Sequence, residues 1–331
     1  MQSRFGFIPI ALVLLGCDVD GSASLDASPD PTTCDEFRSV ECVYLEPPQP
    51  LACNPGALSA DWTDRAIAEV NRIRGFAELA PVAYDASFES ATASCALITA
   101  VNQTPAASPP DDSLCYTPEG AAACGQSNVT LFSFSIDSDD PSRVIPLLFT
   151  PEVIVRRWLM DLSGDPNLGH RRWLLDPFLK RTAFSAVHTA AFNGTVVNAK
   201  QAVSLLVVEP VNEPAGALER DFVAYPIGNF PASLVDHEHY LSFSLLADRA
   251  QRAGNFNVNL DDVLITVTGP DGTMDIVDQA ADNTGSGIPN HVRWLVDGLE
   301  KDTEYIVVVE GVEATQLPAR YEYTFKLDSS L

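Results

Sequence analysis

The change in hydrophobic periodicity along the chain constrains its fold most. Up to about residue 175, apolar residues recur at the three- and four-residue spacing of amphipathic helices. From about residue 183 they form short continuous or alternating runs, which are typical of strands. Beyond residue 230 only strand patterns remain, separated by turn residues. Because 331 residues suffice for two domains, we predict an α+β domain followed by an all-β domain.

Three helices are predicted in the first domain. The first covers residues 62–73, and the second is capped by Asp85. The third begins at Thr150, whose hydroxyl precedes a proline at the first helical position and an acid in the first turn. Residues 102–126 are rich in Pro, Ala and Asp and are predicted to form a loop.

Strands are predicted in both domains. Residues 183–188 and 203–208 supply strands to the first domain, which indicates helix and sheet layers around one core. In the second domain, short strands separated by turns predict a β-sandwich of the immunoglobulin or fibronectin type III kind. Its strand patterns cover residues 240–245, 263–268, 291–296, 305–309 and 321–327.

The N-terminus has the pattern of an export signal. Arg4 is followed by an apolar stretch over residues 5–15, which is too short to span a membrane. The sequence Leu-Leu-Gly-Cys17 resembles a bacterial lipobox, in which the cysteine is acylated; an ordinary signal peptide is the alternative. We therefore predict a signal peptide over 1–16, a flexible tether over 17–33, and a lipid on Cys17 that anchors the protein to a bacterial membrane, on the extracytoplasmic side.

The cysteines predict disulfides. Six remain after Cys17, and an even set in an exported chain indicates three bridges, for which 15 connectivities exist. The short Cys115–Cys124 closure is the favoured pair, and metal ligation is disfavoured because no Cys-x-x-Cys occurs. The Cys- and Pro-rich segment 34–57 is expected to lack regular structure. The six cysteines are Cys34, Cys42, Cys53, Cys95, Cys115 and Cys124.

The charge balance excludes one class of function. The chain carries 20 basic and 45 acidic residues, a formal net charge of −25. Such a field repels phosphate backbones and anionic lipid headgroups. We therefore exclude nucleic-acid binding.

Three ordered motifs carry a resemblance to a known family. They are Asn71-Arg-Ile-Arg74 with the following Pro-Val-Ala-Tyr-Asp85, residues 117–129, and Trp158 with Gly-His170-Arg-Arg-Trp-Leu-Leu-Asp-Pro. In this order and spacing they resemble the CAP superfamily (cysteine-rich secretory proteins, antigen 5 and pathogenesis-related-1 proteins; the SCP domain), over roughly residues 55–190. The resemblance implies a three-layer α-β-α sandwich with a central cleft, which we expect over 58–228, with the β-sandwich over 229–331.

The family resemblance also implies a set of cleft residues. In that family, two histidines and two acids line the cleft and can hold a divalent ion such as zinc. The corresponding positions here are Gln103, Ser127, Asp161 and His170, so only the last two keep a ligand-type side chain. Because zinc takes three or four strong ligands, we predict a degenerate cleft and no confident metal site or cofactor.

Two functions remain open. We prefer a non-enzymatic, envelope-anchored module that binds a ligand or partner, whether protein, lipid or another envelope component. The alternative is a metal- or water-assisted hydrolase, of which a protease is one form, using Asp161 and His170 as an acid–base pair. No Gly-x-Ser-x-Gly nucleophile turn supports it, and His170 has a structural alternative in holding the loop before Trp173. His237 and His239 share one face of any local strand, and an exposed linker is the preferred interpretation over a metal site.

Overall fold

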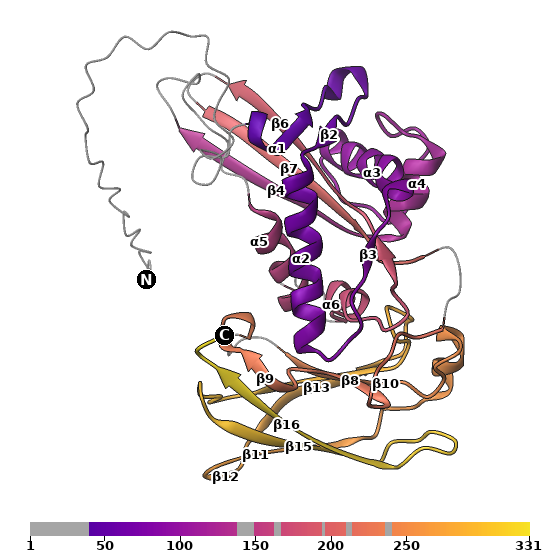
Figure 1. Ribbon diagram of the computed structural model, residues 1–331, viewed down its shortest axis with the longest axis vertical. Coiled ribbons are helices and arrows are strands. Elements are labelled where there is room, and N and C mark those ends of the chain that lie inside the picture. Colours follow the sequence, from indigo (N-terminus) through magenta and orange to yellow (C-terminus); the bar gives the residue numbers. More distant parts are fainter. Residues whose placement is uncertain (1–39, 138–148, 162–166, 194–195, 210–213, 236–239) are drawn as a thin grey trace, which may run out of the picture.

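The protein is described by a computed structural model that covers residues 40–137, 149–161, 167–193, 196–209, 214–235 and 240–331. Along the long axis, a helix-and-sheet body lies at one end and two packed sheets lie at the other (Figure 1). Helices and strands both contribute many residues, so the predicted α+β class is confirmed. Within the described residues, no helix is long and apolar enough to cross a membrane.

Outside its three-stranded sheet, the first body contains six α-helices, two 3-10 helices and two short strand pairs among its described residues. The bounds of these elements are α1 (Val40–Val43), β1 (Tyr44–Glu46), η2 (Pro50–Ala52), β2 (Ala57–Leu58), α2 (Ala60–Phe76), β3 (Ala83–Tyr84), η3 (Ala86–Phe88), α3 (Glu89–Asn102), α4 (Pro118–Gly125), α5 (Pro151–Met160), α6 (Gly169–Leu174) and β5 (Arg181–Thr182).

Local capping explains where two of the predicted helices begin. The Thr150 hydroxyl accepts a hydrogen bond from the Val153 amide, and Pro151 opens α5, as predicted. The Asp85 carboxylate accepts from the Ser87 amide at 3.0 Å, so it caps η3, which leads into α3. The loop predicted over 102–126 is wrong in its last part. Thr117 caps α4 there through its hydroxyl, because Pro118 and a run of alanines favour a helix.

A three-stranded antiparallel sheet forms the centre of the first body. Its order is β4-β7-β6, with β4 at Ser127–Asp137, β6 at Phe184–Asn193 and β7 at Val196–Leu206. All eleven residues of β4 pair with β7 without a register shift. The two strands predicted here are confirmed and are longer than predicted, whereas β4 was not predicted.

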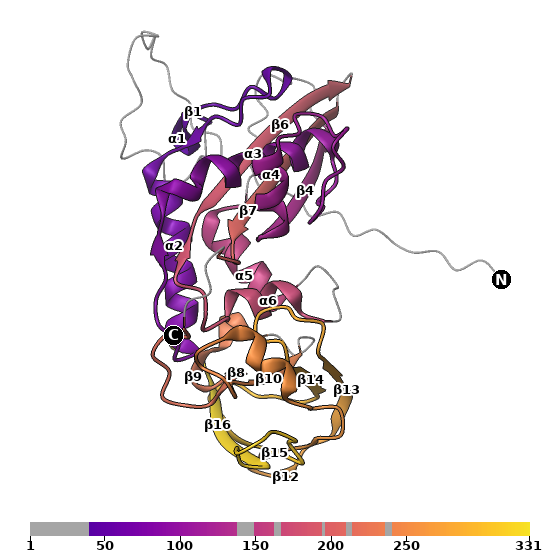
Figure 2. The same cartoon turned by 90° about the vertical axis from the view of Figure 1, so that its right-hand side faces the viewer.

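Helices cover both faces of this sheet (Figure 2). On one face, Ala96, Leu97 and Ala100 of α3 pack against Val187 and Ala202. On the other face lie α2 and α5, whose buried stripes include Trp62, Val70, Ile154 and Trp158, together with Ala186 and Val203 of the sheet. Adjacent residues of one strand therefore face different helix layers.

Charged residues of the first motif hold this body together. The buried Arg74 guanidinium donates to the carbonyl oxygens of Ala80, Leu174, Asp176 and Leu179 at 2.9–3.4 Å. Burial lowers its pKa to about 10, which still leaves it protonated at neutral pH. Its role is therefore to satisfy backbone carbonyls that would otherwise be buried without a donor.

The second body is a β-sandwich with two sheets, of orders β13-β14-β10-β8 and β12-β11-β15-β16-β9. Alternate residues of β15 and β16 face the core between them, including Val307 and Phe325. All five predicted strands are present. The strand bounds are β8 (Phe222–Tyr225), β9 (Gly228–Pro231), β10 (Leu241–Leu245), β11 (Leu264–Gly269), β12 (Gly272–Thr273), β13 (Ile276–Asp282), β14 (His291–Val296), β15 (Glu304–Glu310) and β16 (Arg320–Asp328), with η5 (Ala232–Leu234) and η6 (Arg252–Asn257) between them.

The sandwich begins earlier in the chain than the expected boundary at residue 229. Strand β8 precedes that point, yet its residues Phe222–Tyr225 pair with β10 inside the four-stranded sheet. The reason is that every residue of β8 is buried, so the strand carries no alternating pattern that sequence reasoning could assign to a sandwich.

Two disulfides join described residues, and neither is the favoured Cys115–Cys124 pair, which is wrong. Cys53 bonds Cys115, and Cys95 bonds Cys124. The physical reason is that α4 packs on α3 and places Cys124 directly against Cys95, whereas Cys115 lies in the turn before α4 and faces the 50–53 turn. Disulfides indicate folding in an oxidising, extracytoplasmic compartment.

The N-terminal segments fall partly outside the described residues. Residues 1–39 lie outside them, including the predicted signal peptide, the tether, Cys17 and Cys34. Cys42 is disulfide-bonded. The segment 34–57 was expected to lack regular structure, but its described part contains α1, β1 and η2, and Tyr44–Glu46 pairs with Ala57–Leu58.

Candidate functional site

Asp161 and His170 lie together, as the family resemblance implies. Asp161 ends α5 in the left-handed backbone region at φ 54°, and His170 lies in the first turn of α6. The His170 Nδ1 is 3.2 Å from the Asp161 Oδ1, and the His170 amide donates to Oδ2 at 3.0 Å. The Asp161 side chain is fully buried, whereas that of His170 is 22% exposed.

The contacts of this pair are largely with backbone. The Asp161 carboxylate also accepts from the Arg171 amide at 3.4 Å, so it stabilises the first turn of α6 as an N-terminal acid does. The His170 carbonyl accepts from the Asn128 side chain at 3.0 Å, which connects α6 to the start of β4. The pair therefore fixes the junction of α5, α6 and β4.

The other two expected cleft residues lie elsewhere. Asn128 and Thr130 of β4 bond to α6 and α5, so the alternating Ser127 faces the opposite, α3/α4 side of the sheet, as Val129 does. The Ser127 hydroxyl is buried, with no hydrogen-bond partner in the described part of the chain. Gln103 caps the C-terminus of α3 and lines a separate cavity that includes Lys200.

No metal centre is built from the residues that the structure describes. Among them, no group of three or more His, Cys, Asp or Glu side chains is arranged to hold an ion. His237 and His239 lie outside the described residues, so the structure does not place them.

The two arginines after His170 join the two bodies, a role that sequence reasoning did not find. Arg171 donates to the carbonyls of Leu159 and Tyr240, each at 2.6 Å, and its guanidinium lies 4.0 Å from the centre of the Tyr225 ring. Arg172 forms an ion pair with Asp282 and donates to the Pro289 carbonyl at 3.1 Å. Nothing local in the sequence reveals the partners Tyr240, Asp282 and Pro289, which are 69, 110 and 117 residues away.

A glycine marks how closely the sandwich approaches this motif. Gly287 has φ +56°, and a Cβ at that position would lie 2.2 Å from the Arg172 carbonyl oxygen. Any larger residue would therefore clash with the backbone of α6. The Gly-His-Arg-Arg-Trp motif thus works as an inter-domain joint.

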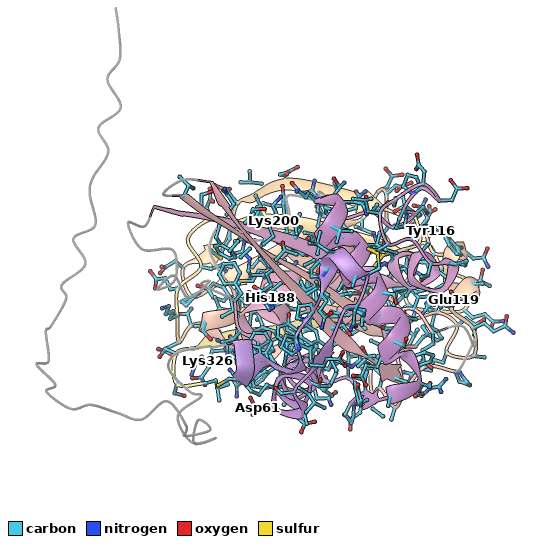
Figure 3. All side chains as sticks on the ribbon, turned by 90° about the horizontal axis from the view of Figure 1, so that it is seen from above. Asp61, Tyr116, Glu119, His188, Lys200 and Lys326 are labelled. Atoms are coloured by element: carbon cyan, nitrogen blue, oxygen red, sulfur yellow. A yellow bond between two sulfur atoms is a disulfide. The ribbon has the colours of Figure 1, made fainter. Side chains whose placement is uncertain are left out.

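A cavity of about 640 Å³ lies at the opposite end of the three-stranded sheet. Lys200, on its wall, is six positions along β7 from Leu206, the partner of Ser127, which corresponds to about 20 Å. Figure 3 looks down on this end and labels Lys200. Among the residues that the structure describes, the wall is mostly apolar, contains no acidic residue, and is formed by Pro50, Leu51, Cys53, Ala100, Val101, Gln103, Leu114, Cys115, Thr189, Ala190, Ala191, Asn198 and Lys200.

A buried histidine lies beside this cavity on the other face of β6. His188 hydrogen-bonds the Tyr44 hydroxyl, and its ring meets those of Tyr44 and Trp62 edge-on. Desolvation lowers the pKa of His188 to about 3, so the ring is neutral at physiological pH. Sequence reasoning could not find this histidine, because a single histidine in a strand carries no information about its partners.

Comparison with known proteins gives no assignment: no family model and no curated protein sequence matches this chain.

Proposed function

We propose that this protein is an exported, lipid-anchored binding module of CAP-like architecture that holds an apolar or amphipathic small ligand in the cavity lined by Lys200. The observation that carries the proposal is the cavity itself. Its volume of about 640 Å³ falls in the range of small-molecule sites, and its wall combines apolar surface with a few polar groups. Helices on both faces of a central sheet support the CAP-like layering.

The lining chemistry favours a ligand with an apolar body and a polar end. Leu51, Val101, Leu114 and Ala191 supply hydrocarbon surface, and Lys200 supplies a positive charge to the wall. Burial of each ligand methylene contributes about 0.8 kcal/mol. A chain of eight carbons therefore gains roughly 6 kcal/mol, enough for binding in the micromolar range once a polar end is also held.

The experiment that tests the proposal is titration with 1-anilinonaphthalene-8-sulfonate, a probe with an apolar body and one anionic group. We expect stoichiometric binding to the folded protein, weakened at least about ten-fold by Ala191→Trp, because Ala191 lines the cavity on the same face of the sheet as Lys200 and the larger side chain fills it. Lys200→Glu should weaken it comparably, through charge rather than volume.

The matched control is Ala93→Trp. Ala93 lines a separate cavity of about 430 Å³ on α3, so this variant adds the same side chain without entering the proposed site. Equal affinity in Lys200→Glu, Ala191→Trp and the wild type would overturn the proposal.

A hydrolase is the second candidate, favoured by the 3.2 Å approach of Asp161 to His170 and by the partial exposure of the histidine ring. Equilibrium dialysis against zinc tests it. Stoichiometric micromolar binding that His170→Ala abolishes would favour this candidate, whereas absence of binding would leave the cavity as the functional site.

A further inference from the structure

Two leucines at the mouth of the cavity are strongly exposed. Leu51, in η2, is fully exposed, and Leu114 is 64% exposed, although both line the same cavity. The Cys53–Cys115 disulfide joins the two turns that carry them. We call Pro50, Leu51 and Leu114, which all line this cavity, the leucine rim. Exposed apolar side chains around an apolar cavity mark an interaction surface.

The position of the rim points to its partner. It lies at the end of the molecule away from the sandwich, and the chain enters the folded body through α1 in the same half (Figures 1 and 2). The residues before α1 include the apolar stretch 5–15 and Cys17. Residues 18–39 span at most about 75 Å when fully extended. Membrane attachment at the N-terminus would therefore keep the rim within reach of the bilayer.

The charge of the protein favours one kind of bilayer. The chain has a net charge of −25, which opposes approach to an anionic surface. In its described part, the cavity wall has no acidic residue and carries Lys200, which suits the phosphates of a neutral, zwitterionic lipid. Such a surface accepts the two leucines without repelling the rest of the molecule.

We propose that the leucine rim inserts into a zwitterionic lipid bilayer, so that the cavity opens onto lipid and exchanges its ligand with the membrane. This interaction rests on the proposed function, because the cavity is the site that it would supply. Each leucine leaves water on insertion, and the mouth of the cavity is then closed to solvent by lipid.

Depth-sensitive quenching of full-length protein in phosphatidylcholine vesicles tests this interaction. Leu51→Trp and Leu114→Trp place a fluorophore on the rim while keeping it apolar. We expect vesicles with acyl-chain-brominated phosphatidylcholine to remove most of the fluorescence that either variant adds to the wild type. The control is Leu264→Trp on β11 of the sandwich, because Leu264 is 63% exposed, almost as exposed as Leu114.

The outcomes separate the interaction from the proposed function. Rim tryptophans quenched no more than Leu264→Trp would overturn the interaction, while sulfonate-probe binding in solution would keep the cavity as a binding site. Loss of probe binding as well would remove both. Replacing half of the lipid with phosphatidylglycerol should reduce the quenching at low salt; unchanged or stronger quenching would overturn the choice of a zwitterionic surface.

Discussion

The two ends of the three-stranded sheet differ in what their polar residues do. At the end beside the sandwich, Asp161, Arg171 and Arg172 bond mainly to backbone groups and leave little open space. At the other end, Gln103 and Lys200 line an apolar cavity of about 640 Å³. The dense polar motif therefore joins elements of the structure, and we propose the open cavity at the other end as the binding site.

The joint has a clear physical origin. The last carbonyls of a helix lack partners within that helix. Arg171 supplies donors to two of them, Leu159 at 2.6 Å and Met160 at 3.4 Å, and also reaches the sandwich through Tyr240. A guanidinium can do this because its donors point in several directions within one plane.

The largest effect should come from breaking the joint. Arg172→Met leaves Asp282 and two carbonyls without their buried donor, so we expect a loss of about 3–5 kcal/mol in the free energy of unfolding, measured by urea denaturation. The control Arg320→Met removes exposed ion pairs and should change stability by less than about 1 kcal/mol. Equal losses in the free energy of unfolding of the two variants would mean that Arg172 does not hold the two bodies together.

Reduction of the disulfides tests the end of the sheet that carries the cavity. Cys53 is exposed, whereas Cys95 and Cys124 are buried. A mild dithiol should therefore reduce the Cys53–Cys115 disulfide before the Cys95–Cys124 disulfide. Because that bond closes a long loop, we expect a stability loss of about 2–4 kcal/mol and weaker probe binding. Alkylation followed by peptide mapping identifies the freed thiols. Labelling of Cys95 before Cys53 would contradict this order.

The pH dependence of stability also tests this comparison, because the described part of the chain has a buried histidine near each end of the sheet: His188 at the cavity end and His291 at the sandwich end. Burial lowers the pKa of His188 to about 3, and desolvation with nearby arginines lowers that of His291. The unfolded chain binds these protons near pH 6.5, so stability is complete above that pH and is lost as pH falls toward 3. Each histidine should contribute up to about 1.4 kcal/mol per pH unit.

Denaturant midpoints at pH 7.5 and 5.0 measure this loss. His188→Gln should reduce the difference between the two midpoints, since glutamine does not titrate and can still hydrogen-bond Tyr44. An unchanged difference would show that His188 is protonated in the folded state.

The smallest effect should come from replacing His170, which lies in the cleft that the family resemblance predicts. His170→Ala should leave binding of the sulfonate probe within about two-fold of the wild type, because His170 lies at the other end of the sheet from the cavity. Probe titration measures it. A ten-fold loss of probe affinity would show that the two ends of the sheet are coupled and would contradict the comparison.

Local physics made much of the fold predictable. The cap at Thr150 and the alternation in β15 and β16 require only neighbouring residues, so their elements were found. Strand β4 was missed because its apolar residues change phase between Leu131 and Phe132, and the fully buried β8 has no alternation to find. At the site, only the proximity of Asp161 and His170 could be predicted, because the family motif spans both.

The sequence by itself determined the α+β class, the three predicted helices, the seven predicted strands and the presence of cysteines that pair. Tertiary structure alone decided that Cys115 bonds Cys53, that Arg172 meets Asp282, and that Leu51 and Leu114 share a cavity. The reason is physical: periodicity and capping depend on residues a few positions apart, whereas these contacts join residues 62 to 110 positions apart that only packing brings together.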